Sequence, residues 1–242
     1  MKLLFAPMAT LSHAGMRQII DGFGGCDEYY TEMIHASAFI HGGKYEPYYS
    51  LSCPEPQKLV WQLTDSDSDK LSECAAILMQ EKLPRWHIPE GMQSGDKHAI
   101  GVDINMGCSA PDIIKQGAGF AWMSKPLTEV ADMLHKVRGA FDGRLSCKIR
   151  LGNDTGEDNK SLHVHHSDTD FSEAYFYEYL DMLIESGVTQ IVLHPRTRRE
   201  KLCRPPRYHF IEEAAVYVHK KAAEKNTTIA FSGNGNVTCI AD

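Results

Sequence analysis

The chain has 242 residues, of which 43% are hydrophobic and 24% are charged, a composition that is ordinary for a globular protein. Its length fits one large α/β domain, because barrels of that class commonly hold about 200–250 residues in a single unit. The formal net charge of −7 argues against a protein that binds nucleic acid with its whole surface, although a local basic patch is compatible with it.

Residues 3–7 form a short apolar segment that ends in Pro7. This run is too short for a signal peptide, and no stretch of the chain reaches the ~20 continuous apolar residues of a membrane span. We therefore expect a first β-strand here, and a cytoplasmic protein that does not cross a membrane. The seven cysteines, at positions 26, 53, 74, 108, 147, 203 and 239, form no CxxC pair and predict neither a disulfide framework nor a zinc site.

Seven short apolar runs rich in branched residues recur along the chain and predict β-strands. They are Leu3–Pro7, Glu28–Met33, Leu59–Leu63, Ala99–Asn105, Leu145–Arg150, Gln190–His194 and Thr228–Ser232. Apolar residues at helical spacing lie between the runs. They predict helices around Leu71–Leu78 and Leu127–Val137, from about Phe171 to Ser186 with Gly187 behind it, and from Phe210 to about Lys225.

Alternating strands and helices predict a parallel sheet covered by helices, as a (β/α)₈ barrel or a doubly wound sheet. No GxGxxG follows the first strand, which weakens the second architecture. Polar residues instead follow several strands, as in TIM-type barrels. These residues are Pro7-Met8, Glu32, Gln62, Asn105, Lys148, His194 and Asn234. We therefore predict a TIM-type (β/α)₈ barrel over residues 1–242, truncated after its seventh strand because an eighth is missing.

Two polar segments, Leu83–Lys97 and Gly152–Asp170, look like insertions and predict surface loops. The second contains His163, His165 and His166. No cysteine or carboxylate stands near these histidines at a fixed ligand spacing, so we interpret them as part of a solvated loop and predict no metal site.

Taken alone, each polar residue at a strand end has more than one interpretation. Cys108, after Asn105-Met106-Gly107, could be a nucleophile, an acid or a buried small hydrophobe. Lys148 could pair with a carboxylate such as Glu32 or Asp103, and Glu32 could simply brace a strand end. The basic run of Arg196, Arg198, Arg199, Lys201, Arg204 and Arg207 could be a solvated face or a patch that contacts RNA phosphates.

The ordered set of short motifs resembles the tRNA-dihydrouridine synthase family. The set comprises Ala6-Pro7-Met8-Ala9, Thr31-Glu32-Met33, Gln62-Leu63, Asp103-Ile104-Asn105-Met106-Gly107-Cys108, Lys148-Ile149-Arg150-Leu151-Gly152, His194-Pro195-Arg196-Thr197 and Asn234-Gly235-Asn236. Each motif is weak by itself, whereas their common order from Phe5 to about Val237 is specific. The resemblance implies an FMN-dependent barrel oxidoreductase that acts on tRNA.

The resemblance also implies a role for each motif. Pro7, Met8 and Ala9 would lie at the edge of the flavin, and Gln62 and Lys148 would hold the polar edge of its ring, where a cation stabilises the reduced form. His194 would lie near the ring and phosphate. Asn234, Gly235 and Asn236 match a phosphate-binding turn whose backbone amides cradle an anion. Asn105, Arg196 and Thr197 would contact the substrate.

Cys108 aligns with the catalytic cysteine of the family. In the implied reaction NADPH or NADH reduces FMN, the reduced flavin delivers hydride to C6 of a flipped-out uracil, and Cys108 donates a proton to C5. The chain departs from the family pattern at Ser109, where proline is usual, and at Asn236, where aspartate is usual. We also expect the chain to lack the C-terminal helical domain through which the family grips tRNA, and we infer no obligate protein partner.

Two other functions compete with this one. A flavin barrel like dihydroorotate dehydrogenase would reduce a free pyrimidine, but the basic run after His194 and the Asn-Met-Gly-Cys string favour the tRNA enzyme. A barrel without catalysis would serve only to bind RNA. The joint presence of Gln62, Cys108, Lys148 and His194 speaks against that interpretation.

Overall fold

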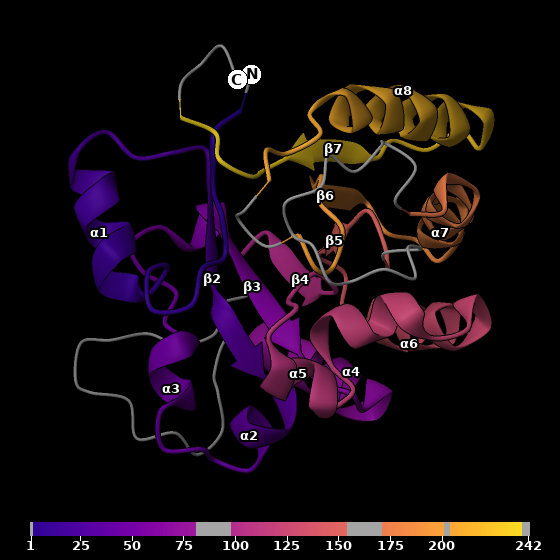
Figure 1. Cartoon of the computed structure of the whole chain (residues 1–242). Helices are drawn as coiled ribbons and strands as arrows, with labels where there is room; N and C mark the ends of the chain where they lie inside the picture. The colour runs from indigo at the N-terminus through magenta and orange to yellow at the C-terminus, as the bar shows by residue number, and fades with distance from the viewer. Residues whose placement is uncertain (1, 81–97, 154–170, 201–203, 239–242) are drawn as a thin grey trace. The chain divides into compact units, whose positions relative to one another are not determined.

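The computed structural model describes residues 2–80, 98–153, 171–200 and 204–238 (Figure 1). They form two compact units. The first contains residues 1–105 and 133–145, and the second contains residues 106–132 and 146–242. The predicted loop Leu83–Lys97, most of Gly152–Asp170 and the three histidines at 163, 165 and 166 lie outside the described residues.

The first unit is built on four parallel strands that pair in chain order. These strands are β1 (Leu4–Phe5), β2 (Glu28–His35), β3 (Leu59–Thr64) and β4 (Gly101–Asn105). The helices of this unit are α1 (Ala14–Gly22), α2 (Ala36–Ile40), α3 (Glu46–Tyr49), the 3₁₀ turn η1 (Pro56–Lys58) and α4 (Ser68–Leu78). Every side chain of β3 is buried, which explains why its sequence is almost continuously apolar.

Helix α4 shows how the local sequence sets the elements of this unit. The Asp67 carboxylate accepts hydrogen bonds from the backbone amides of Asp69 and Lys70 and so caps the first turn. Leu71, Cys74, Ala75 and Leu78 are fully buried, as the helical spacing predicts. Their stripe faces β3 and α2, which α4 contacts.

The second unit continues the same alternation. Strands β5 (Arg144–Arg150), β6 (Gln190–His194) and β7 (Ala230–Gly233) are parallel and pair in chain order, with β5 beginning in the first unit. The helices are α5 (Pro111–Lys115), η2 (Gly119–Ser124), α6 (Leu127–Arg138), α7 (Glu173–Glu185) and α8 (His209–Glu224), and α6 ends in the first unit. Helices α7 and α8 pack side by side, and α8 also contacts β7 (Figure 1). Ser172 caps α7, and Gly187 with φ of 77° follows its end, as predicted.

These seven parallel strands, the first six of them followed in sequence by helical segments, give the fold class that the sequence predicts, a TIM-type α/β barrel. Several bounds differ from the prediction. The first strand is only Leu4–Phe5, and β2 runs on to His35. Glu32, Gln62 and Lys148 therefore lie inside their strands rather than at the ends, as two to three further residues stay paired in each case. Helices α1, α2, α3 and α5 were not predicted.

The start of β4 and the start of β5 pack backbone against backbone in the first unit. The amide of Arg144 donates to the carbonyl of Ile100 at 2.9 Å. The Arg144 guanidinium also forms two hydrogen bonds of 3.0 and 2.7 Å with the carboxylate of Glu28, which is only 4% exposed. Bidentate pairing of this kind fixes position as well as charge, so β2 and β5 are tied at their amino-terminal ends.

The five described cysteines, at positions 26, 53, 74, 108 and 147, form no disulfide bond with one another. No helix among the described residues has the length and apolar character needed to span a bilayer. Within the same residues, no group of three or more His, Cys, Asp or Glu side chains is arranged to hold a metal ion.

Glu46, at the start of α3, has a buried carboxylate oxygen, Oε2, without a hydrogen-bond partner among the described residues. Burial raises the pKa of this carboxyl to about 7, against an opposing effect of His35. The folded protein therefore holds a proton here that the unfolded chain releases, and stability falls as the pH rises from about 4.5 to 7.

Glu46→Gln should remove this loss, because the amide does not titrate. We expect the variant to be more stable than the parent by about 1–2 kcal/mol at pH 8 and to show little advantage at pH 5, since solvent reduces the burial penalty of a partly exposed group. Urea unfolding at the two pH values measures the difference. Exposed Glu73→Gln on α4 is the control, with changes within about 0.5 kcal/mol at both pH values. An equal gain at pH 5 and pH 8 would contradict the assignment.

Candidate functional site

The loop after β1 carries the predicted flavin contacts Pro7, Met8 and Ala9 and is tied down by the residues that follow. The Met8 amide donates to Ser12 Oγ at 2.9 Å, and that hydroxyl donates back to the Met8 carbonyl at 3.0 Å. Ser12 is fully buried, whereas Met8 and Ala9 are exposed. Hydrogen bonds to the buried Ser12 thus fix the loop, while its apolar residues Met8 and Ala9 stay accessible.

Arg17 on α1 braces this loop from the interior of the first unit. Its side chain is 1% exposed, and its guanidinium donates to three backbone carbonyls, those of Ser12 (2.6 Å), Leu51 (2.6 Å) and Cys53 (3.1 Å). Glu32 accepts a hydrogen bond from the Thr10 amide at 2.5 Å. The interpretation of Glu32 as a brace is therefore supported by a contact that holds the same loop.

Gln62 and Asn105 are brought together by a buried ladder of side chains across β3 and β4. The Gln62 amide nitrogen donates to Asp103 Oδ2 at 2.7 Å, and its oxygen accepts from Asn105 Nδ2 at 2.8 Å. All three residues are at most 6% exposed. The ladder fixes which end of the Gln62 amide is the donor and which is the acceptor, so the orientation of this side chain is set by the protein.

An irregularity in β2 supports this ladder. The register between β2 and β3 shifts between Tyr30 and Met33, and the Thr31 hydroxyl accepts the Gln62 amide at 3.0 Å in place of a backbone carbonyl. Bulges of this kind are frequent next to functional sites, where they redirect a side chain.

Cys108 lies in the loop between β4 and α5 in the second unit. The residue is half-buried, whereas Met106, two positions earlier, is fully buried and accepts a hydrogen bond from the Tyr179 hydroxyl on its sulfur. Arg150 Nε donates to the Gly107 carbonyl at 2.7 Å, and the Phe120 amide donates to the Cys108 carbonyl at 2.9 Å. Cys108 therefore stands on a well-anchored loop outside the hydrophobic core, as a reacting group requires.

Lys148 on β5 is linked to the turn after β7. Its Nζ donates to Asn234 Oδ1 at 3.4 Å. Arg150 follows two positions later on the same face of the strand and donates to the carbonyls of Gly107 and Thr197. Two cations on neighbouring positions of one face make this part of the second unit electropositive.

His194, the last residue of β6, is held beside Arg196. Arg196 Nη1 lies 2.9 Å from His194 Nε2, and Nη2 donates to Asn236 Oδ1 at 3.0 Å. Burial lowers the pKa of His194 to about 3, together with the positive charges of Arg150, Lys148 and Arg196. The imidazole is neutral at physiological pH.

The Asn234–Asn236 turn has the backbone that an anion cradle needs. Gly235 has φ of 116° and Asn236 has φ of 52°, so two consecutive residues lie in the left-handed region. A Cβ at Gly235 would lie 3.4 Å from His194 Nε2 and 3.5 Å from Arg196 Nη1. The Tyr208 hydroxyl fixes the turn by donating to the Gly235 carbonyl at 2.6 Å. The open backbone of the turn, the Arg196 guanidinium and the neutral His194 imidazole together suit an anionic group such as a phosphate.

The basic run after His194 is partly internal, so its interpretation as a solvated face is wrong for three members. Arg196 is 1% exposed and also donates to the Arg204 carbonyl. Arg204 and Arg207 both pair with the buried carboxylate of Glu200, at 3.3 and 2.8 Å. Thr197 is fully buried as well, and its amide donates to Glu200. Direct substrate contact by Arg196 and Thr197 stays a prediction.

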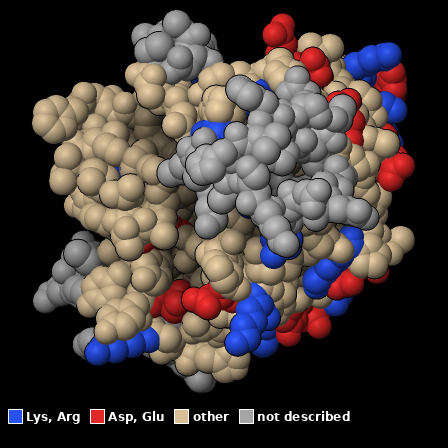
Figure 2. Space-filling view, in the orientation of Figure 1, with Lys and Arg blue, Asp and Glu red and all other residues tan. Residues whose placement is uncertain are grey.

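Positive and negative side chains lie in small mixed groups on the face drawn in Figure 2.

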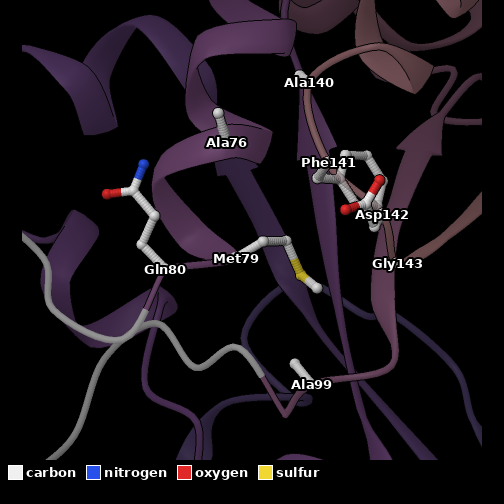
Figure 3. A pocket seen from close by; sticks show the side chains of 8 residues that line it. All are labelled: Ala76, Met79, Gln80, Ala99, Ala140, Phe141, Asp142 and Gly143. Atoms are coloured by element: carbon white, nitrogen blue, oxygen red, sulfur yellow. The ribbon is translucent and has the colours of Figure 1, made fainter.

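A hollow of about 420 Å³ in the first unit lies away from the predicted residues, at the amino-terminal ends of β4 and β5. Met79 extends from α4 toward Phe141 and Ala99 there, whereas Gln80 points to the other side (Figure 3). The lining mixes polar and apolar groups, Gln80 and Asp142 among them, and we assign it no function.

Sequence reasoning did not foresee the contacts of four residues that support the predicted ones: Arg17, Asp103, Arg150 and Glu200. The sequence holds a signal for two of them. Asp103 and Arg150 stand two positions from Asn105 and Lys148, and alternate residues of a strand share a face. Arg17 and Glu200 act on partners that only the folded chain brings near.

The family model described as dihydrouridine synthase (Dus) matches residues 4–88 and 92–242. A probable tRNA-dihydrouridine synthase of Aquifex aeolicus is 24% identical over 100% of this chain and 63% of its own length. The probable tRNA-dihydrouridine synthase 1 of a Synechocystis species is 26% identical over 99% of this chain and 55% of its own. The tRNA-dihydrouridine(16) synthase of Ralstonia nicotianae is 24% identical over 100% and 63%. The chain thus spans 55–63% of the length of these three relatives.

Proposed function

Because the chain belongs to the dihydrouridine synthase family, we propose that residues 1–242 form the FMN-binding catalytic barrel of an enzyme that reduces uridines in tRNA to 5,6-dihydrouridine. NADPH or NADH is the reductant in this proposal. The observation that carries it is the cluster of Lys148, His194 and the Asn234–Asn236 turn, which combines a cation, a neutral imidazole and left-handed backbone.

We propose a distinct role toward the flavin for each of the predicted cofactor-binding residues. The Lys148 ammonium group compensates negative charge at the polar edge of the ring, and Gln62 contributes an oriented amide. The turn at Asn234–Asn236 presents backbone amides to the phosphate, with space that a side chain at Gly235 would fill. Pro7, Met8 and Ala9 cover the edge of the ring. When bound, the reduced flavin supplies the hydride for the uracil.

Cys108 supplies the proton in this proposal. Its thiol donates to C5 of the uracil as the C5–C6 double bond is reduced, and the thiolate that forms is reprotonated from solvent. A half-buried position on an anchored loop suits this role, because the sulfur must be fixed and yet reachable. Asn105 is the proposed contact for the base. We propose a cytoplasmic enzyme, since its substrate is tRNA.

The function is tested with the purified full-length gene product and with a host strain that lacks dihydrouridine synthases. The protein should be yellow and release FMN, and its gene should restore dihydrouridine in the tRNA of that host, measured by mass spectrometry of digested tRNA. Turnover of free uracil or orotate in place of tRNA would favour the free-pyrimidine alternative. A colourless protein that restores no dihydrouridine would exclude the proposal.

Lys148→Met should weaken FMN binding by roughly 10- to 100-fold, as expected for the loss of a charged hydrogen bond. Flavin fluorescence titration of the apoprotein measures the dissociation constant. Exposed Lys220→Met on α8 removes the same charge elsewhere and should leave the constant unchanged. Equal affinity of the Lys148 variant and the parent would remove Lys148 from the site.

A further inference from the structure

The Arg196 side chain joins three segments of the second unit. Its Nε donates to the Arg204 carbonyl at 2.7 Å, its Nη2 donates to Asn236 Oδ1 at 3.0 Å, and its Nη1 lies 2.9 Å from His194 Nε2. The side chain is 1% exposed. The guanidinium is therefore held in one orientation, with a single N–H directed at the imidazole.

This geometry fixes the tautomer of His194. A guanidinium carries only donors, so the imidazole nitrogen that faces it must be the acceptor. Nε2 is then without a proton, and the proton of the neutral ring sits on Nδ1. The charges that face the ring keep it neutral, because Lys148 and Arg150 from β5 and Arg196 from the loop after β6 are all positive, and burial acts in the same direction to lower the pKa.

The other nitrogen of the ring, Nδ1, is not used by any described residue, and His194 as a whole is partly exposed. An Nδ1–H group donates to oxygen acceptors and cannot accept from a donor. The ring is thus selective for an acceptor atom, which is the chemistry of a carbonyl or phosphate oxygen.

We propose that Arg196 is a positioning residue, which holds His194 as the neutral Nδ1–H tautomer so that the ring presents one N–H donor to an oxygen of the bound cofactor. The identity of that cofactor rests on the function proposed above. The assignment of the His194 tautomer does not, because it follows from the contact with Arg196. The hydrogen bond from Arg196 to Asn236 also reaches the turn after β7. One side chain therefore orients both the His194 imidazole and the Asn234–Asn236 turn.

The tautomer is measured directly on the ligand-free protein. The full chain labelled with ¹⁵N-histidine is studied by NMR, and the His194 signals are assigned by their loss in His194→Asn. We expect a protonated, pyrrole-type shift for Nδ1 and a pyridine-type shift for Nε2, unchanged between pH 5.5 and 8. A protonated Nε2 in the parent protein would overturn the proposal without any variant.

Three variants test the role of Arg196. Arg196→Met removes the donor and should shift the ring toward the Nε2–H form that free imidazole side chains favour, with roughly 10-fold weaker FMN binding. Arg196→Lys retains a donor and should restore the Nδ1–H signal. Exposed Arg199→Gln is the control and should change neither signal. An unchanged tautomer in a folded Arg196→Met protein would contradict the proposal, whereas a correct tautomer in a protein that fails to bind FMN would contradict only the proposed function.

Discussion

Cys108→Ala is expected to bind FMN as tightly as the parent protein and to reduce uridine roughly 10²- to 10⁴-fold more slowly, the range found when a positioned proton donor is removed. The structure gives the reason why binding should survive. The hydrogen bonds that anchor this loop use the backbone carbonyls of Gly107 and Cys108, which alanine keeps. Only the sulfur is lost.

The measurement is single-turnover formation of dihydrouridine in unmodified tRNA, followed by mass spectrometry, with the flavin absorbance of each sample as the check on binding. Cys26→Ala is the matched control, because Cys26 is also a half-buried free thiol and lies in the other unit. It should turn over at the parental rate. Parental turnover by Cys108→Ala would show that another group, or water, supplies the proton.

Gly101→Ala is expected to prevent folding of the first unit or to destabilise it by more than about 4 kcal/mol. A Cβ at this position would lie 2.0 Å from the carbonyl oxygen and 2.6 Å from the amide nitrogen of Arg144. Both atoms are backbone atoms, so no rotamer change relieves the contact. Separation of β4 from β5 would also break the hydrogen bond between Arg144 and Ile100.

Circular dichroism with urea unfolding measures this effect. Gly22→Ala serves as the control in the same unit, because a Cβ there meets no atom within 4 Å and position 22 is helical. That substitution should be neutral or stabilising by about 0.5–1 kcal/mol. A Gly101→Ala protein that unfolds at the same urea concentration as the parent would show that β4 and β5 are not packed this closely.

The sequence predicts the regular part of the fold because periodicity is a local property. The runs Leu59–Leu63 and Gln190–His194 are buried strands, and the predicted helix before Gly187 ends where that glycine takes a positive φ. Helix α1 was not predicted. Its buried residues are Ala14 and Arg17, whereas its apolar residue Ile19 is 56% exposed, so its buried face does not follow its apolar residues.

The supports of the candidate site are harder to predict because they depend on tertiary contacts. Arg17 is fully buried although arginine is mostly exposed in proteins, and it is satisfied by carbonyls 34 and 36 residues away. The internal position of Arg196 likewise depends on Asn236, 40 residues later. The motif residues themselves were identified by their order along the chain, which needs no knowledge of these partners.

The pairing of Glu200 with Arg204 and Arg207 has a consequence for the response to ionic strength. Each phosphate that a free cation neutralises releases condensed counterions and adds about 0.9 to the slope of log K against log salt for double-stranded nucleic acid. Guanidinium groups already matched by a buried carboxylate contribute little of that release. A polyanion that binds to this segment would therefore depend less steeply on added salt than a count of its six basic residues suggests.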